Sequence, residues 1–129
     1  MSGAIWRVAT CALLAAFATT TLAFADDTDP GRKQFLTSCG TCHTTDKDGG
    51  NRQGPNLFAV YGRKAGTLEG FAYSDTLKAG GWVWDETTLD VWITDAQAAH
   101  PGTVMNYRQA NPDKRKLVIQ YLKSLSAQN

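Results

Sequence analysis

The stretch Cys39-Gly40-Thr41-Cys42-His43 determines how the rest of the chain is interpreted. Two thiols followed at once by an imidazole match C-x-x-C-H, the attachment motif for c-type haem. The thiols can form thioether bonds to the two vinyl groups of one porphyrin, and the histidine can bind the iron as proximal ligand. Because two cysteines and a histidine must fall at fixed offsets, the motif is specific. It predicts one haem c, covalently bound through Cys39 and Cys42.

Other interpretations of these residues are weaker. A zinc site needs a second pair of ligands at a suitable spacing, and outside the motif the chain has only Cys11 and His100 of these types. A thioredoxin-like redox pair is expected beside a βαβ pattern, which the sequence lacks. A disulfide between Cys39 and Cys42 remains open in an oxidising compartment, but it leaves His43 without a role.

Residues 1–25 are expected to be a cleaved secretory signal peptide. Arg7 is their only charge, an apolar run covers residues 9–17, and Ala23-Phe24-Ala25 fits an A-x-A cleavage site. The alternative is a membrane anchor, but the apolar run is shorter than the ~20 residues of a spanning helix. We therefore predict a mature domain of residues 26–129 in a bacterial periplasm, without stable membrane insertion.

The charge balance argues against nucleic acid or an anionic membrane as a partner. Loss of residues 1–25 removes one basic residue and leaves twelve basic and twelve acidic residues. So short a chain builds only a modest core. We therefore expect one small domain whose core includes the haem.

Helix signals occur at both ends of this domain. Asp29-Pro30 and Asn111-Pro112 each place a capping side chain before a proline, which is typical of a helix start. Ser74 and Asp85 are expected to cap two further helices, and a short helical turn is expected over residues 57–61. No alternating strand pattern appears, so the predicted fold class is all-α.

A second axial ligand is sought in the long connection over residues 95–110. In the whole mature chain the candidates are Met105 and His100, both in this connection, and the lysines outside it. An isolated methionine is usually core filler, but Met105 follows Pro101-Gly102 in a loop, away from any helical stripe. We predict that it binds the iron, where a thioether raises the reduction potential. His100 is interpreted as an ordinary exposed residue.

The chain resembles a class I c-type cytochrome, the family of mitochondrial cytochrome c and the periplasmic cytochromes of purple bacteria. The resemblance covers residues 31–123 and implies the cytochrome c fold, with crossed N- and C-terminal helices around one haem. It also implies that the Pro55 carbonyl accepts a hydrogen bond from the ligand histidine. The matching segments are Gly31, Phe35, Cys39–His43, Gly54–Leu57, Gly62–Lys64, Gly70-Phe71, Tyr73–Asp75, Trp84, Pro101–Met105 and Tyr121–Lys123.

The resemblance further implies which side chains surround the haem. Arg63, Tyr73 and Trp84 are donors suited to a buried propionate, which must be paired and hydrogen-bonded. They also fit a purely structural interpretation, in which Arg63 is a solvated surface charge and Tyr73 and Trp84 are ordinary core aromatics. The implied haem-binding residues are Cys39, Cys42, His43, Pro55, Arg63, Tyr73, Ser74, Trp84, Thr103 and Met105, with His43 and Met105 on the iron.

Two features depart from the family pattern. Trp92 stands where the family often has a tyrosine near the ligand sulfur, and an indole donates one hydrogen bond but accepts none. Gln97, Ala98 and Val104 stand where mitochondrial members carry lysines around the exposed haem edge. This second departure argues against a partner of the mitochondrial type.

These residues predict a monomeric, non-enzymatic electron carrier. It should pass single electrons between redox proteins such as a membrane-bound oxidoreductase, an oxidase or a periplasmic dehydrogenase. With both axial positions filled, no substrate binds the iron. The alternative is a haem enzyme or gas sensor with an open sixth position, which requires that Met105 is not a ligand.

Overall fold

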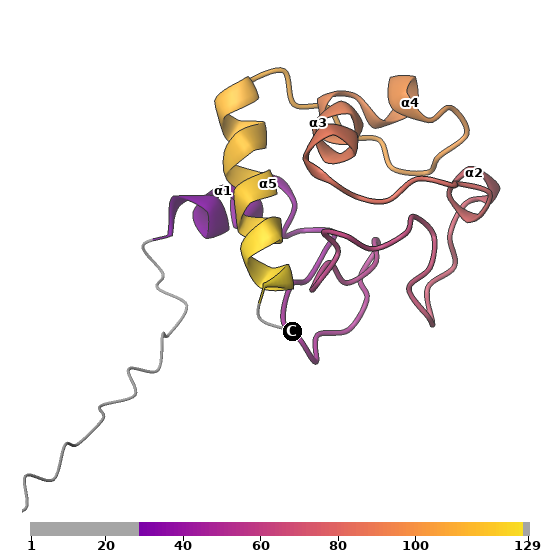
Figure 1. Ribbon diagram of the computed structural model, residues 1–129, viewed down its shortest axis with the longest axis horizontal. Coiled ribbons are helices and arrows are strands. Elements are labelled where there is room, and N and C mark those ends of the chain that lie inside the picture. Colours follow the sequence, from indigo (N-terminus) through magenta and orange to yellow (C-terminus); the bar gives the residue numbers. More distant parts are fainter. Residues whose placement is uncertain (1–28, 128–129) are drawn as a thin grey trace, which may run out of the picture.

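The computed structural model describes residues 29–127, so the predicted signal peptide lies outside the described part of the chain. Within that part the secondary structure is helical, and extended segments meet only in two isolated antiparallel bridges, Lys64–Val83 and Asp95–Arg108. The prediction of an all-α fold is confirmed. The helices, labelled in Figure 1, are α1 (Pro30–Ser38), α2 (Asp75–Lys78), α3 (Glu86–Thr94), α4 (Ala96–Ala99) and α5 (Pro112–Ser126).

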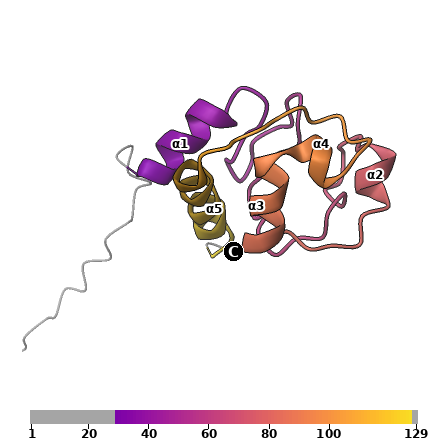
Figure 2. The ribbon, with the colours of Figure 1, turned by 90° about the horizontal axis from the view of Figure 1, so that it is seen from above.

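The two terminal helices, α1 and α5, pack against each other (Figures 1 and 2). A Cβ atom at Gly31 would lie 2.8 Å from the Leu117 carbonyl oxygen, so only a glycine permits this approach without a shift. One turn later Phe35, which is 1% exposed, packs its ring against that of Tyr121 at 5.5 Å between centroids. The predicted contact between the first and last helices is therefore present.

Each of the four predicted N-caps is formed. The Asp29 carboxylate accepts from Gly31 N at 2.8 Å, and the Asn111 side chain accepts from the first turn of α5. Ser74 caps α2, and Asp85 forms a capping box with Thr88 at the start of α3. The helix starts thus follow from local hydrogen bonding, as the sequence indicates.

The predicted helical turn over residues 57–61 is wrong. The Asn56 side-chain oxygen accepts from Phe58 N at 2.8 Å, which closes a tight turn instead. Ala59 then has a φ of 53°, in the left-handed region that a right-handed helix cannot include. The chain bends here and does not continue as a helix.

The connection over residues 95–110 contains a helix that was not expected, α4. Asp95 ends α3 and caps α4, because its carboxylate accepts from Ala98 N at 3.0 Å. The sequence after this cap contains three alanines and a glutamine, which are good helix formers. The capping residue followed by these residues was a signal for α4 that the long-loop interpretation overlooked.

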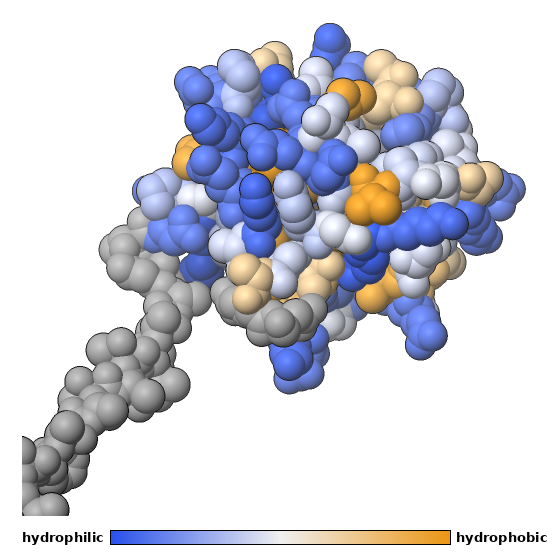
Figure 3. Space-filling view, viewed as in Figure 1, coloured by the Kyte–Doolittle hydropathy of each residue, from blue (hydrophilic) through white to orange (hydrophobic). Residues whose placement is uncertain are grey.

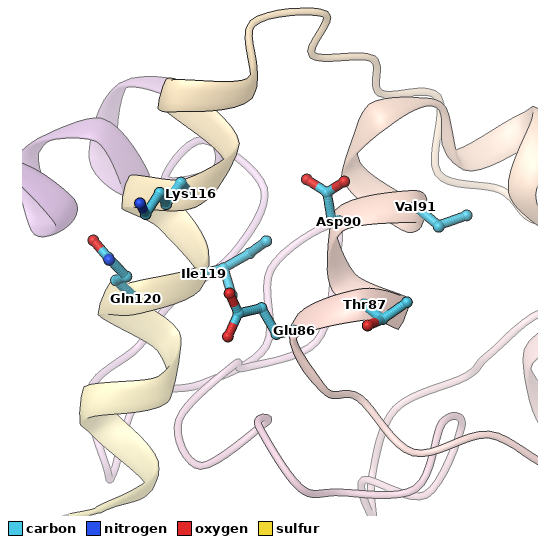
Figure 4. Close-up of a pocket in the computed structure, with 7 residues that line it drawn as sticks. All are labelled: Glu86, Thr87, Asp90, Val91, Lys116, Ile119 and Gln120. Carbon is cyan, nitrogen blue, oxygen red and sulfur yellow. The ribbon is translucent and has the colours of Figure 1, made fainter.

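Helix α3 also packs against α5. Arg115 joins them, since its Nε lies 2.7 Å from Asp90 Oδ1 and its Nη1 donates to the carbonyls of Gln109 and Ala110. A surface cleft of about 600 Å³ lies between the two helices (Figure 4), and none of the predicted haem-binding residues lines it. Its walls are the side chains of Glu86, Thr87, Asp90, Val91, Lys116, Ile119 and Gln120.

The surface in the view of Figure 3 is mostly hydrophilic, with apolar side chains in small separate groups. The exposed large apolar residues of the described chain are Leu36, Val83, Val91 and Val104, of which Val104 is the most exposed at 77%. Among residues 29–127, no helix is long and apolar enough to cross a membrane.

The close approach at Gly31 predicts a large difference between two glycine substitutions. We expect Gly31→Ala to lower the free energy of unfolding by about 1–3 kcal/mol, because the new methyl group meets backbone that cannot rotate away. Gly50→Ala is the matched control, since a Cβ there has nothing within 4 Å. Denaturant unfolding of both variants measures the difference, and equal stabilities would contradict the packing at the α1–α5 contact.

Candidate functional site

The C-x-x-C-H segment begins where α1 ends. Cys39 N donates to Phe35 O at 2.7 Å, and His43 N then donates to Cys39 O at 3.0 Å, so the motif forms a turn. No disulfide joins Cys39 to Cys42. The turn keeps the two sulfurs and the imidazole in one short stretch at the end of α1, the helix that buries Phe35.

The environment of Cys39 does not suit thiolate chemistry. Burial, with the neighbouring Cys42 thiol adding to it, raises the pKa of Cys39 to about 12. A reactive redox cysteine uses the thiolate form, which such an environment disfavours. The described residues also contain no cluster of three or more His, Cys, Asp or Glu side chains that would hold a metal ion.

His43 lies directly beneath the backbone of Gly54 and Pro55. Any Cβ at Gly54 would overlap the imidazole ring, and Gly54 N donates to Cys42 O at 2.8 Å, which ties the two segments together. On the ring itself, Nδ1 lies 2.8 Å from Pro55 O. The glycine therefore makes room for the ring, and the following carbonyl binds it.

This hydrogen bond determines the tautomer of His43. A carbonyl oxygen only accepts, so Nδ1 carries the proton and Nε2 of the neutral ring keeps a lone pair. Burial lowers the pKa of His43, and the bond to Pro55 partly opposes that shift. The ring is accordingly held neutral, with the free nitrogen that a metal ligand requires.

Asn56 holds the Pro55 segment in place. The side chain is buried, and its Nδ2 donates to Thr44 Oγ1 at 2.8 Å and to the carbonyls of Asp46 and Gly49 at 2.9 Å. Together with the turn to Phe58, these bonds join both ends of the loop that follows the haem motif. Sequence reasoning noted Asn56 only as part of a matching segment, and its four local bonds became visible only in the fold.

Met105 is half-buried and packs against the main hydrophobic core, as does Cys39. Its loop is tied to α2, because Thr76 Oγ1 donates to Pro101 O at 3.0 Å. Thr103, two residues before the methionine, is 6% exposed, and its Oγ1 has no hydrogen-bond partner. The loop thus brings one thioether and one unsatisfied hydroxyl into the interior.

Arg63 and Trp84 lie on adjacent extended segments. Trp84 N donates to Arg63 O at 2.9 Å, and the Arg63 guanidinium donates to the carbonyls of Asn56 and Phe58. Burial lowers the pKa of Arg63 and raises that of Tyr73, and the two groups are close enough to oppose each other's shift. Ser74 serves as the cap of α2, with its oxygen 3.4 Å from Leu77 N.

The interpretation of His100 as an ordinary exposed residue is wrong. Its ring is half-buried and stacks on Trp82 at 3.8 Å between centroids and 2° between planes, with Trp92 at 5.7 Å. Burial lowers the pKa of His100. Sequence reasoning also missed Trp82, whose Nε1 is buried without a partner. Its only sequence signal was its position two residues before Trp84.

Comparison with known proteins decides between the haem, zinc, redox and disulfide interpretations of the C-x-x-C-H motif. A family model described as Cytochrome c matches residues 28–126. The chain belongs to the cytochrome c family. Proteins of this family are electron-transfer haem proteins that bind one covalent haem c through cysteines, and Cys39 and Cys42 supply those cysteines here.

Similar curated proteins come from both bacteria and eukaryotes. Cytochrome c2 iso-2 of Magnetospirillum molischianum is 46% identical over 91 residues, which cover 70% of this chain and 93% of that protein. Cytochrome c of Chlamydomonas reinhardtii is 39% identical over 104 residues, covering 80% and 93% respectively. Cytochrome c of Gibberella zeae is 40% identical over 98 residues, covering 75% and 92%.

The residues present fit a haem. Buried polar groups are normally hydrogen-bonded, and an unpaired one carries a cost. Within residues 29–127 the buried side-chain donors without a partner are Thr103 Oγ1 and Trp82 Nε1. A group that brings carboxylate acceptors and a large apolar ring would satisfy such donors and enlarge the modest core of this cytochrome.

We expect the haem to be a folding requirement. Cys39→Ala/Cys42→Ala protein made in the periplasm should be unfolded or degraded, because so small a domain loses much of its apolar core without the ring. Wild-type protein made in the same way is the reference. Haem staining, yield and a far-ultraviolet circular dichroism melt compare the variants. A cooperative, native-like melt of the haem-free double variant would contradict the expectation.

Proposed function

We propose that this cytochrome is a periplasmic single-electron carrier whose haem iron is bound by His43 and Met105. The observation that carries the proposal is the 2.8 Å contact between His43 Nδ1 and Pro55 O, since it places the proton on Nδ1 and leaves Nε2 the lone pair that iron requires. The haem supplies one-electron redox chemistry when bound. The chain holds it, excludes water and tunes its potential.

The proposal for Met105 rests on its surroundings. The residue is half-buried on the core, in a loop that hydrogen bonds attach to α2 and α4. Apart from Met1, it is the sole thioether of the chain. A neutral, soft sulfur favours ferrous over ferric iron and so supports a high potential.

The propionates of the haem are proposed to meet a set of buried or half-buried donors. Thr103 supports this best, because its hydroxyl is buried and unsatisfied. Arg63 has guanidinium N–H groups beyond those bound to Asn56 and Phe58, and Tyr73 lies near it. The proposed set is Arg63, Tyr73, Ser74, Trp84 and Thr103.

The proposed location is the periplasm of a bacterium. The signal-peptide pattern over residues 1–25 supports it, and so does the similarity to a bacterial cytochrome c2. Cytochromes c of eukaryotes match equally long parts of the chain. The predicted signal peptide therefore supports the periplasmic location more strongly than the relatives do. The proposed partners are redox proteins that meet a monomeric carrier.

The ligand proposal is tested with a substitution on the iron and one beside it. Met105→His should lower the reduction potential by on the order of 0.1 V, out of the roughly 0.8 V that axial ligation spans, because a basic nitrogen favours ferric iron. Val104→His is the matched control: it adds the same ring at an exposed position and leaves the thioether in place. Spectroelectrochemistry measures both.

Two results of that experiment would overturn the proposal. One is an unchanged potential in Met105→His. The other is wild-type ferrous protein that binds carbon monoxide readily, because an open sixth position is the property of the haem enzyme or gas sensor.

Docking should depend weakly on salt. Gln97, Ala98 and the protruding Val104 carry no charge. The cations expected near this face are Arg52, Lys78 and Arg108. Lys78 pairs with Asp75 at 3.7 Å and Arg108 with Asp95 at 3.6 Å, while Arg52 donates to the Gly40 carbonyl and keeps its charge. At a Debye length of ~8 Å, so sparse a positive field should raise the association rate little.

Stopped-flow electron transfer to the redox partner across a salt series measures this dependence. We expect less than a tenfold fall in the second-order rate from roughly 0.01 to 0.15 M salt, over which the Debye length shrinks from ~30 to ~8 Å. Val104→Lys adds a charge at the exposed tip and should change the slope. A tenfold or larger fall for the wild type would refute an uncharged docking face.

A further inference from the structure

Gln97 forms an unusual pair of hydrogen bonds with the methionine loop. Its Nε2 lies 2.9 Å from Thr103 O and 2.9 Å from Met105 O. A primary amide has two N–H groups, so one nitrogen can donate to both carbonyls at once. The two carbonyls flank Val104, whose side chain is 77% exposed. Among residues 29–127, Gln97 is the side chain that bonds to both of them.

The helix that carries Gln97 is itself fixed to the fold. Its first residue, Ala96, is fully buried, and Ala96 N donates to Tyr107 O at 3.1 Å. Asp95 caps the helix through Ala98 N and pairs with Arg108 by a backbone bridge and an ion pair. The amide therefore reaches the loop from a helix that is attached to the chain on the far side of Met105.

The rest of the Gln97 residue contributes little else. It is exposed as a whole, it lies outside the hydrophobic core, and the capping of α4 does not involve its side chain. At this position sequence reasoning noted only the absence of a lysine. What the fold adds is that a neutral amide here can bond to the loop at two points.

We propose that Gln97 is a positioning residue for Met105: its amide holds the backbone on both sides of Val104, and so keeps the thioether at the haem iron and limits the opening of the loop. This inference rests on the proposed ligation by Met105. The loop opens whenever an external ligand replaces the sulfur, and the apparent affinity of that ligand rises with the open fraction. Loss of two hydrogen bonds should raise the open fraction about tenfold or more.

Imidazole binding to the ferric holoprotein tests the proposal, with the sulfur–iron charge-transfer band near the red edge of the spectrum as the second readout. Gln97→Met removes both donors and keeps an unbranched, neutral side chain of similar length. Gln97→Glu also removes the donors and provides a second variant. Gln120→Met, an exposed glutamine on α5, is the matched control for the same chemical change.

We expect Gln97→Met and Gln97→Glu to bind imidazole at least about tenfold more tightly than wild type, with a weaker sulfur–iron band, while Gln120→Met matches wild type. Thermal melting of the ferrous protein should be similar in all four, because the change is local. Affinities of the Gln97 variants within twofold of the control would overturn the role of Gln97. So would a general loss of stability that explains the weaker band.

Failure of the underlying ligation has a different signature. Wild-type protein would then lack the sulfur–iron band altogether, and its affinity for imidazole would be the same whatever residue stands at position 97. That result removes both proposals. A strong wild-type band with no effect of the Gln97 substitutions removes only the positioning role.

Discussion

The hydrogen bond from His43 Nδ1 to Pro55 O is the interaction on which the proximal side of this cytochrome depends. It assigns the proton to one nitrogen of a half-buried, neutral ring and leaves the other for the proposed bond to iron. The bond forms because Gly54 has no side chain that would overlap the ring. It also depends on Asn56, the residue after Pro55, whose buried side chain hydrogen-bonds to the preceding loop. The proposed iron ligand is thus held in place by Gly54, Pro55 and Asn56, which are not themselves proposed to bind the metal.

The contact of α1 with α5 places this arrangement in the fold. Gly31 lets the two helices approach, Phe35 buries itself against Tyr121, and the haem motif starts within one turn of that contact. Chain ends far apart in sequence therefore position the cysteines together. On the other side of the core, α4 and its amide hold the loop of the second proposed ligand. The loops that carry the two proposed ligands are ordered by polar contacts more than by regular secondary structure.

Local chemistry explains what the sequence could predict. Helix starts such as Asp29-Pro30 depend on neighbouring residues, and the C-x-x-C-H motif depends on fixed offsets, so both were readable before the fold was known. The predictions that failed did so for two reasons: a side chain formed a hydrogen bond that replaced the expected structure, or the contacting residue lay far away in the sequence. Asn56 bonded to Phe58 N and replaced the expected helical turn with a bend. His100 was misjudged because the stacking Trp82 lies eighteen positions earlier, and no local pattern indicates such a pair.

The central claim is that the iron has two protein ligands and exchanges one electron. Spectroelectrochemical titration of the wild-type holoprotein tests it most directly. The account predicts a single Nernstian step, with a slope of ~59 mV per decade for one electron, between two low-spin states, the ferric one showing the sulfur–iron band. A high-spin ferric spectrum without that band, or a titration that changes with added carbon monoxide, would contradict it.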